Sequence, residues 1–301
     1  MPDRTPERSS DRTLVMGILN VTEDSFSDGG EWIDPQRAVD HARAMIADGA
    51  DIIDVGGEST RPGAVRVDAE VEAARVVPVI QALAAEDIAV SVDTMRVTTA
   101  AAAVAAGATI VNDVSGGLAD PDMDRVVAEA NQDRAVDYCL MHWRAERFES
   151  AAGRADHTGG VLADVTGHLV DLADRAQRAG VPGDRIILDP GLGFAKDPAD
   201  NWSLLRGLGD VTALGHRVLV GASRKRFLTA LRPAADGAPA AADSAAADQA
   251  TAAVTALVAA SGAWAVRVHD IASNRVAADV AHAVATGRGP ALPEGWRARR
   301  G

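Results

Sequence analysis

Polar and charged side chains stand at or just after the ends of short apolar runs along the chain, and their types suit ligand binding. Left buried without a partner, each such group would cost about 1–3 kcal/mol. A single Asp at such a place is more often a helix cap or a loop acceptor, but a set of this size predicts one shared site for a polar ligand. The set comprises Asn20, Asp54, Glu58, Asp93, Asn112, Asp113, His142, Asp189, Ser223, Arg224, Lys225, Arg267, His269 and Asp270.

The residue types in this set indicate two chemistries. Asp93, Asn112 and Asp189 carry carboxylate and amide groups, which can recognise a flat heterocycle bearing N–H and amino groups. Cationic side chains can hold a multiply charged anion. The candidates for that second role are Lys225, Arg61, Arg267 and His269.

The segment GASRKRF (221–227) predicts an anion site at the start of a helix. We expect Ser223 to be the N-cap, and three cations follow it. A helix N-terminus already favours anions through its free N–H groups and its dipole, so cations at this place indicate a negative ligand. No Walker motif is present, which argues against nucleoside triphosphate hydrolysis.

Two glycine-containing loops, TEDSFSDGG (22–30) and GGESTRPGA (56–64), follow the first two apolar runs. Both combine Gly or Pro with hydroxyl and charged side chains. Such a composition is typical of loops that close over a substrate and then release the product, although ordinary surface turns are the alternative.

Eight β-branched or apolar runs must position these residues, and Ala-rich segments with helical periodicity separate them. This alternation predicts a parallel α/β sheet. Eight such units in about 250–290 residues fit a single-domain (β/α)8 TIM barrel, whose catalytic groups stand at the carboxyl ends of the strands. An open doubly wound sheet is less favoured, since no GxGxxG follows the first run. The runs are 14–20, 50–56, 88–94, 108–114, 136–142, 185–191, 217–223 and 265–270.

Helix boundaries carry their own signals. Starts are expected at Asp34-Pro35, at Asp68 with Glu70 and Glu72, and at Asp120-Pro121. Glycines that end a helix and turn into the next strand are expected at Gly49, Gly107, Gly180 and Gly262.

The chain divides into one domain with two tails. We expect a disordered N-terminal tail (1–13), the barrel (14–287) and a C-terminal tail (288–301). The N-terminal tail is polar and lacks the apolar core of a signal peptide. Residues 143–160 predict a long mobile surface loop, and residues 232–247, rich in Pro, Ala and Gly, predict an exposed insertion.

Composition excludes several partners. A net charge of -13 over 301 residues argues against nucleic acid and anionic membranes as partners. The uncharged run 249–266 is mostly Ala and predicts a helix running into a strand rather than a membrane span. The single cysteine, Cys139, excludes an intramolecular disulfide and is expected to be filler in a buried strand, which suits a reducing cytoplasm.

Eight motifs in this order resemble the dihydropteroate synthases of folate biosynthesis, a family of pterin-binding barrels, from about residue 14 to residue 284. The actinobacterial type is the most similar. The motifs are MGILNVTEDSFSDGG (16–30), DVGGESTRPGA (54–64), SVDT (91–94), NDVSGG (112–117), LMHW (140–143), DPGLGFAK (189–196), GASRKRF (221–227) and RVHD (267–270).

This resemblance implies a reaction. The family condenses 6-hydroxymethyl-7,8-dihydropterin pyrophosphate with p-aminobenzoate to give 7,8-dihydropteroate and pyrophosphate. We expect magnesium-bound pyrophosphate to leave early, after which the arylamine attacks the methylene cation. Asp93 and Asp189 would stabilise the cation, and Arg61, Arg267, His269 and Mg²⁺ the leaving group.

The resemblance also assigns roles to residues. Lys225 joins Asp93, Asn112 and Asp189 in the pterin pocket, and Met141 and Phe194 lie near the ring faces or the aminobenzoate. Asn20, Arg267 and His269 hold the pyrophosphate, Asn20 through Mg²⁺. Thr60, Arg61 and Pro62 belong to a mobile loop that covers the aminobenzoate, and Lys225 with Arg226 attracts its carboxylate. Sulfonamides should compete there, and a homodimer is usual for the family.

Three departures from the family pattern remove no catalytic group. Glu23 stands where Pro is common, Arg226 where many relatives have Ser, and Ala195 where Gly is common. The first makes its loop less rigid, and the second shifts carboxylate recognition to backbone N–H groups and a guanidinium. We expect little effect from the third.

Three other functions remain open on the sequence. A methyltetrahydrofolate methyltransferase would share the pterin-reading residues but has no use for GASRKRF. An aldolase-like barrel would use Lys225 as a Schiff-base lysine, which borohydride trapping would detect. A pterin-binding relative without turnover would release no pyrophosphate.

Overall fold

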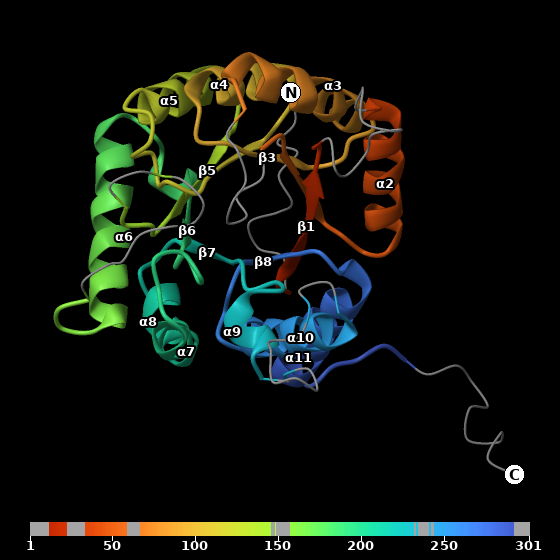
Figure 1. Cartoon of the computed structure of the whole chain (residues 1–301), viewed down its shortest axis with the longest axis vertical. Helices are drawn as coiled ribbons and strands as arrows, with labels where there is room; N and C mark the ends of the chain where they lie inside the picture. The colour runs from red at the N-terminus through yellow and green to blue at the C-terminus, as the bar shows by residue number, and fades with distance from the viewer. Residues whose placement is uncertain are drawn as a thin grey trace, which may run out of the picture.

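The computed structural model describes residues 12–22, 34–58, 67–145, 148, 157–231, 233, 241 and 244–291. Its strands are parallel and close into a barrel in chain order, β1 through β8 (Figure 1). The prediction of a (β/α)8 barrel is therefore confirmed. The strands are β1 (Leu14–Asn20), β2 (Ile52–Gly56), β3 (Val90–Asp93), β4 (Ile110–Asp113), β5 (Asp137–Met141), β6 (Ile186–Asp189), β7 (Arg217–Val220) and β8 (Ala265–Val268).

Helices form a ring around the strands (Figure 1). Within the described residues, one helix follows each strand except at two places, where β6 leads to α7 and α8 and β7 leads to α9 and α10. The helices are α2 (Pro35–Ala47), α3 (Ala69–Ala85), α4 (Val97–Ala106), α5 (Met123–Asp133), α6 (Val161–Arg178), α7 (Pro198–Arg206), α8 (Leu208–Thr212), α9 (Arg226–Thr229), α10 (Ala245–Ala260) and α11 (Ile271–Thr286). A short 3-10 turn, η1 (Gly183–Arg185), precedes β6.

Alternation along each strand separates two buried layers. One strand face packs against the helices, as Val15 and Ile53 do, and the other face fills the barrel interior, as Leu14 and Ile52 do. Cys139 is fully buried in the interior layer, which confirms the expectation that it is filler in a strand.

Most boundary signals are confirmed, and one is wrong. Asp34 is the N-cap of α2, where its carboxylate accepts from the N–H of Gln36 at 2.9 Å. The helix expected at Asp120-Pro121 begins two residues later, because the Asp120 carboxylate instead accepts from the backbone N–H groups of Asp122 and Val97. The four expected glycine corners all have positive φ, at Gly49, Gly107, Gly180 and Gly262.

The segments that interrupt the repeat are only partly described. Between β5 and α6, Trp143 is buried, so the expected surface loop does not begin at that residue. Residues 245–247, assigned to an insertion on the sequence, form the first turn of α10 behind the N-cap Ser244. The run 249–266 is a helix running into a strand, as predicted. Among the described residues, no helix is long and apolar enough to cross a membrane.

Candidate active site

Strand alternation aims one set of polar side chains at the barrel axis. Asn112 and Asp189 each lie two residues after an interior residue of the same strand, Ile110 and Ile187. Asp93 lies four residues after the interior residue Ala89. Because side chains alternate along a strand, all three point inward at the carboxyl end. Strand register sets them at neighbouring levels, because Asp93 pairs with Asn112 and Met141 with Asp189. The same alternation turns Asp113 and His142 outward.

Glycines at two inward positions leave room between these side chains. A Cβ at Gly56 would stand 3.6 Å from Cβ of Asp93 and 3.8 Å from Oδ1 of Asn20. A Cβ at Gly221 would stand 3.8 Å from Oδ2 of Asp189. The barrel therefore has open space beside the carboxylates of Asp93 and Asp189 at the carboxyl ends of its strands, a region called the mouth below.

Arg267 joins the polar residues of three other strands. Its Nε donates to Oδ2 of Asp54 at 2.5 Å, and its Nη2 donates to Oδ2 of Asp93 at 2.6 Å. Asn112 donates from Nδ2 to the same Asp54 oxygen at 3.2 Å. Arg267, which the sequence assigns to an anion alone, is thus held between two carboxylates.

Burial shifts the pKa values in this network. Desolvation raises the pKa of Asp93 to about 7, although Arg267 opposes the shift. Burial alone would lower the pKa of Arg267, but the attraction of Asp54 and Asp93 outweighs it and the pKa is raised. Arg267 therefore stays a cation, while Asp93 can exchange a proton near neutrality.

Lys225 and Asp189 are two further buried groups of opposite charge at the mouth, and they attract each other. Burial lowers the pKa of Lys225 to about 8, against the attraction of Asp189. Burial also raises the pKa of Asp189, against the attraction of Lys225. Oδ1 of Asp189 accepts from the N–H of Gly191 at 2.7 Å, which leaves Oδ2 toward Gly221.

The GASRKRF segment differs from its prediction. Lys225, and not Ser223, is the N-cap of the four-residue helix α9. The Ser223 hydroxyl lies 3.0 Å from Nδ1 of His269 and accepts from the N–H of His269 at 3.2 Å. Arg224 turns away to an ion pair with Asp248 on α10 at 2.7 Å. Of the three cations in the segment, only Lys225 and the exposed Arg226 stay at the start of α9.

An apolar cluster lies beside the polar mouth. Met141, Trp143 and Ala195 are buried in it, and Phe194 packs against it. The rings of Trp143 and Phe194 lie 5.1 Å apart. Nζ of Lys225 stands 4.7 Å from the Phe194 ring centroid, so this cluster borders the charged pair.

Other predicted residues have different outcomes. Asn20 ends β1 beside Gly56. Glu58 pairs with Arg96 at 2.8 Å and supports the α3–α4 side of the barrel. Thr60, Arg61 and Pro62 lie outside the described residues. A depression of about 320 Å³ between the carboxyl ends of α5 and α6 is lined by none of the predicted site residues.

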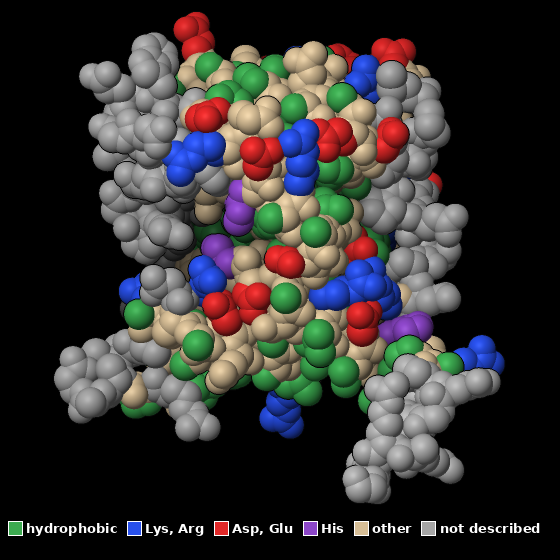
Figure 2. Space-filling model, turned by 90° about the vertical axis from the view of Figure 1, so that its right-hand side faces the viewer, with side chains coloured by type: hydrophobic (Ala, Val, Ile, Leu, Met, Phe, Trp, Pro, Cys, Tyr) green, Lys and Arg blue, Asp and Glu red, His purple; other side chains and the backbone are tan. Residues whose placement is uncertain are grey.

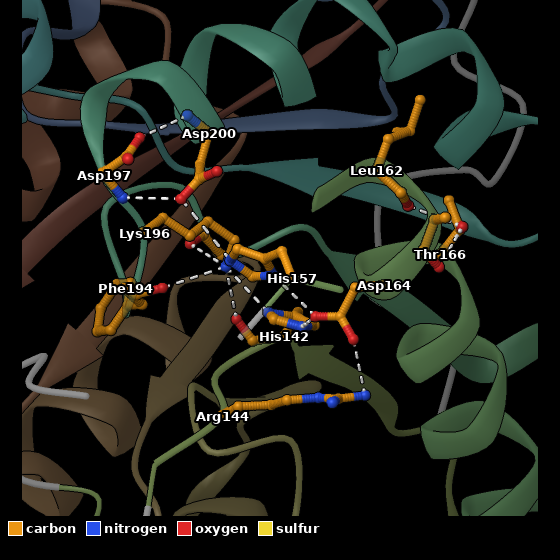
Figure 3. Close-up of polar contacts among 12 residues, drawn as sticks. His142, Arg144, His157, Leu162, Asp164, Thr166, Phe194, Lys196, Asp197 and Asp200 are labelled. Atoms are coloured by element: carbon orange, nitrogen blue, oxygen red, sulfur yellow. Dashed lines mark hydrogen bonds and ion pairs between the residues drawn. The ribbon is translucent and has the colours of Figure 1, made fainter. Parts of the chain in front are cut away.

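The sequence places Asp54 and His142 among the polar residues at strand ends but assigns neither a specific role, and it does not single out Lys196. In the structure, Asp54 faces inward and accepts from Arg267 and Asn112. His142 and Lys196 contact each other at 2.9 Å, beside Phe194 (Figure 3). Their contact joins segments 54 residues apart, which no local pattern reports.

Known proteins resemble this chain over most of its length. A family model described as pterin binding enzyme matches residues 16–269. The dihydropteroate synthase of Mycobacterium leprae is 52% identical over 260 residues, which are 85% of this chain and 88% of that protein.

Solved structures show the same similarity. The dihydropteroate synthase of Clostridium difficile, solved in the presence of pteroic acid, has a TM-score of 0.80 and 38% identity, and the match covers 91% of this chain and 97% of that one. The enzyme of Xanthomonas albilineans with 4-aminobenzoic acid has a TM-score of 0.78 and 39% identity, and the match covers 94% and 95%.

Proposed function

The chain belongs to the dihydropteroate synthases of the pterin-binding enzyme family, and from that membership we propose how its barrel mouth works. It joins 6-hydroxymethyl-7,8-dihydropterin pyrophosphate to p-aminobenzoate, giving 7,8-dihydropteroate and pyrophosphate. The observation that carries this proposal is the convergence of Asp93, Asn112 and Asp189 with Arg267 and Lys225 at one end of the barrel.

The pterin ring is recognised by the acids and the amide. Asp189 accepts from adjacent N–H and amino groups of the ring, which a carboxylate can do with both oxygens. Asn112 and Asp93 read further ring edges, and the Lys225 ammonium donates to ring acceptors. Burial raises the pKa values of Asp93 and Asp189, and the nearby cations Arg267 and Lys225 oppose that shift by favouring the carboxylate form.

The reaction exchanges one bond for another at the methylene carbon. Its C–O bond to pyrophosphate breaks with the electron pair leaving on oxygen, and the arylamine lone pair forms the new C–N bond. The amine then loses a proton to solvent. Asp93 and Asp189 stabilise positive charge that spreads into the ring, while Arg267 stabilises the departing anion.

Asn20, Arg267 and His269 hold the pyrophosphate. Magnesium fits this end of the mouth, because it prefers hard oxygen donors, keeps several waters and is commonly bound by substrate phosphates plus one or two protein groups. The amide oxygen of Asn20 is such a donor. Among the described residues no group of three His, Cys, Asp or Glu could hold a metal, so Mg²⁺ would arrive with the phosphates. When bound, it neutralises charge on the leaving group.

The aminobenzoate lies over the apolar cluster. Met141 and Phe194 supply apolar contact to its ring, and Arg226 with Lys225 attracts its carboxylate. The sequence adds Thr60, Arg61 and Pro62 from the second loop. Sulfonamides, which carry the same aniline ring, compete for this place.

Turnover tests the proposal directly. Purified protein with the pterin pyrophosphate, p-aminobenzoate and Mg²⁺ should release pyrophosphate and form 7,8-dihydropteroate, followed by mass spectrometry. Omission of either substrate should stop both products. Tight pterin binding without any condensation would contradict the proposal and identify a relative without turnover.

A homodimer through α10 and α11 is part of the proposal. Val276, Val280 and Val284 recur every four residues along α11 and are 62%, 53% and 78% exposed, and Leu257 on α10 is 70% exposed. An apolar stripe of this kind favours a partner surface. Light scattering should give twice the chain mass, and Val280→Asp should give a monomer; an unchanged mass would exclude this face.

A cytoplasmic location is also proposed. The one cysteine of the chain, Cys139, is a free thiol buried in the barrel, as expected of a protein kept in a reducing compartment. Cell fractionation should recover the protein with cytoplasmic markers.

A further inference from the structure

Lysine is rare in this chain and occurs only at the mouth. The sequence has 28 arginines but two lysines, Lys196 and Lys225. A lysine ammonium is a compact point charge with three donors, and burial shifts its pKa readily, whereas a planar guanidinium is larger and always charged. Only Lys225 has a role in the proposed reaction.

Lys196 ties two loops together with its ammonium group (Figure 3). Its Nζ donates to the carbonyl oxygens of Gly191 at 3.0 Å and Phe194 at 3.1 Å, and lies 2.9 Å from Nδ1 of His142. The His142 carbonyl is a further acceptor at 3.3 Å. With Lys196 as donor, His142 accepts at Nδ1 and carries its proton on Nε2, which faces Oδ2 of Asp164 at 3.5 Å.

The loop that Lys196 holds is strained and closely packed. Gly191, Gly193 and Ala195 have φ of 66°, 76° and 50°. For Ala195, whose side chain disfavours this left-handed conformation, the cost is about 1–2 kcal/mol. A Cβ at Gly191 would stand 2.1 Å from the His142 carbonyl oxygen, so the loop lies directly on the end of β5. Such a conformation persists only where surrounding contacts enforce it.

The same loop determines where Lys225 lies. Nζ of Lys225 donates to the carbonyl of Leu192, and the Phe194 ring lies against that Nζ. Lys196 binds the carbonyls of Gly191 and Phe194, so Leu192 and Phe194 belong to the segment that it holds. A change in this loop would therefore move Lys225 relative to Asp189.

We propose that Lys196 is a positioning residue: it fixes the loop 191–195, and through Leu192 and Phe194 it sets where the Lys225 ammonium meets the substrate. This inference rests on the proposed function for the role of Lys225. The positioning itself rests on the contacts above.

The charges around Lys196 agree with this role. Burial, and then the nearby Lys225, lower the pKa of Lys196 to about 7 against the attraction of Asp189, Asp164 and Asp200. Burial, and then Lys196, lower the pKa of His142 to about 2, so this ring stays a neutral acceptor. Among the described residues on this side, Arg144 pairs with Asp164 at 3.0 Å, His157 contacts Asp164 at 2.9 Å, and the ring of His168 lies 5.0 Å from that of His142.

Lysine-selective NMR tests the proposal without turnover. Lysine labelled with ¹³C and ¹⁵N should give two side-chain ammonium or amine signals, assigned by Lys196→Met. In that variant the Lys225 signal should move toward the shift of a solvated lysine, because its carbonyl and ring contacts are released. The matched control is Arg206→Met, which removes an exposed cation from α7 and should leave both signals in place.

Hydrogen exchange and kinetics give the functional readout. Exchange of the peptide covering 190–196 should quicken in Lys196→Met but not in Arg206→Met. The Kd of a pterin should rise at least about tenfold, and kcat/KM should fall at least as much. An unmoved Lys225 signal in folded Lys196→Met would overturn the proposal, whatever the activity.

The wild-type protein supplies the fallback and separates the two hypotheses. Should Lys196→Met fail to fold, a pH titration of the wild type decides: the Lys225 signal should respond to the titration of Lys196 as well as to its own. A Lys225 signal that ignores Lys196 would contradict the inference. Wild-type protein that makes no dihydropteroate would contradict the proposed function, but the titration would still test whether Lys196 positions Lys225.

Discussion

At the scale of single residues, the mouth holds acidic and basic side chains whose charged forms are disfavoured by burial. Asp93 has a raised pKa and Lys225 a lowered one, each for the same reason, since both lose hydration. Residue types at the strand ends predict which segments meet at the mouth, but not that Asp113 and His142 of that set face outward. They do not predict that Arg267 binds Asp54 and Asp93, because that pairing joins β8 to β2 and β3 across the barrel.

Asn112→Ala should weaken pterin binding about 10-fold or more, because it removes hydrogen bonds worth about 1–3 kcal/mol. Calorimetry with a pterin measures the change. The matched control is Asn131→Ala on α5, which removes hydrogen bonds to the carbonyls of Val127 and Val136 and should lower stability without changing pterin affinity. Equal pterin affinity in Asn112→Ala and the wild type would remove Asn112 from the pocket.

Asp93→Asn should change how stability depends on pH. Because the pKa of Asp93 is raised from 3.8 to about 7, the folded state binds its proton more tightly than the unfolded state over that range. The free energy of unfolding contributed by Asp93 is then full below pH 3.8, falls as pH rises, and is level above about 7. In urea unfolding, the free energy of unfolding of the variant should rise relative to that of the wild type as pH increases across this range. A difference that stays constant would show that Asp93 is ionised throughout.

At the scale of elements, glycines at helix ends let the chain turn tightly from a helix into the next strand. Gly107 and Gly262 both have positive φ, of 119° and 85°. A Cβ at Gly107 would stand 2.5 Å from Cβ of Ala84 on α3, whereas nothing lies within 4 Å of a Cβ at Gly262. Both positions need a residue that tolerates positive φ, but only Gly107 also lacks room for a side chain.

Gly107→Ala should therefore destabilise the protein more than Gly262→Ala. The backbone penalty is about 1–2 kcal/mol at either position, and the clash with Ala84 adds about 1–3 kcal/mol at the first. Thermal unfolding of the two variants measures the difference. Equal losses would show that α3 and α4 can move apart without cost.

The two errors at this scale have one cause. Asp120 and Ser223 both have side chains that cap helices, and the sequence predicts them as caps. In the fold, Asp120 accepts from α4 and from Asp122, and Ser223 contacts His269 from β8. Partners from other elements compete for the same side-chain oxygens, and a local pattern cannot weigh that competition.

At the scale of the whole molecule, negative charge dominates without excluding basic residues from the surface. The face in Figure 2 shows acidic and basic side chains interleaved rather than sorted into patches. With a net charge of -13, this arrangement offers no extended basic surface on that face for a phosphate backbone.

The protein should accordingly show no shift of duplex DNA or of RNA in a gel at physiological salt. A basic nucleic-acid-binding protein serves as the positive control under the same conditions. Lower ionic strength should not create binding, since like charges repel more strongly when screening weakens. Salt-sensitive binding would reveal a basic patch on a part of the surface beyond that face.

The sequence by itself determined the barrel and the order of its strands, because hydrophobic periodicity and segment length are local properties read along the chain. Tertiary structure alone decided the partners of those side chains. Arg267 between two carboxylates, Ser223 on His269 and Lys196 on His142 all depend on which loops meet at the mouth. Such contacts form only when distant segments are packed together, since the ends of eight strands converge there in space and nowhere along the chain.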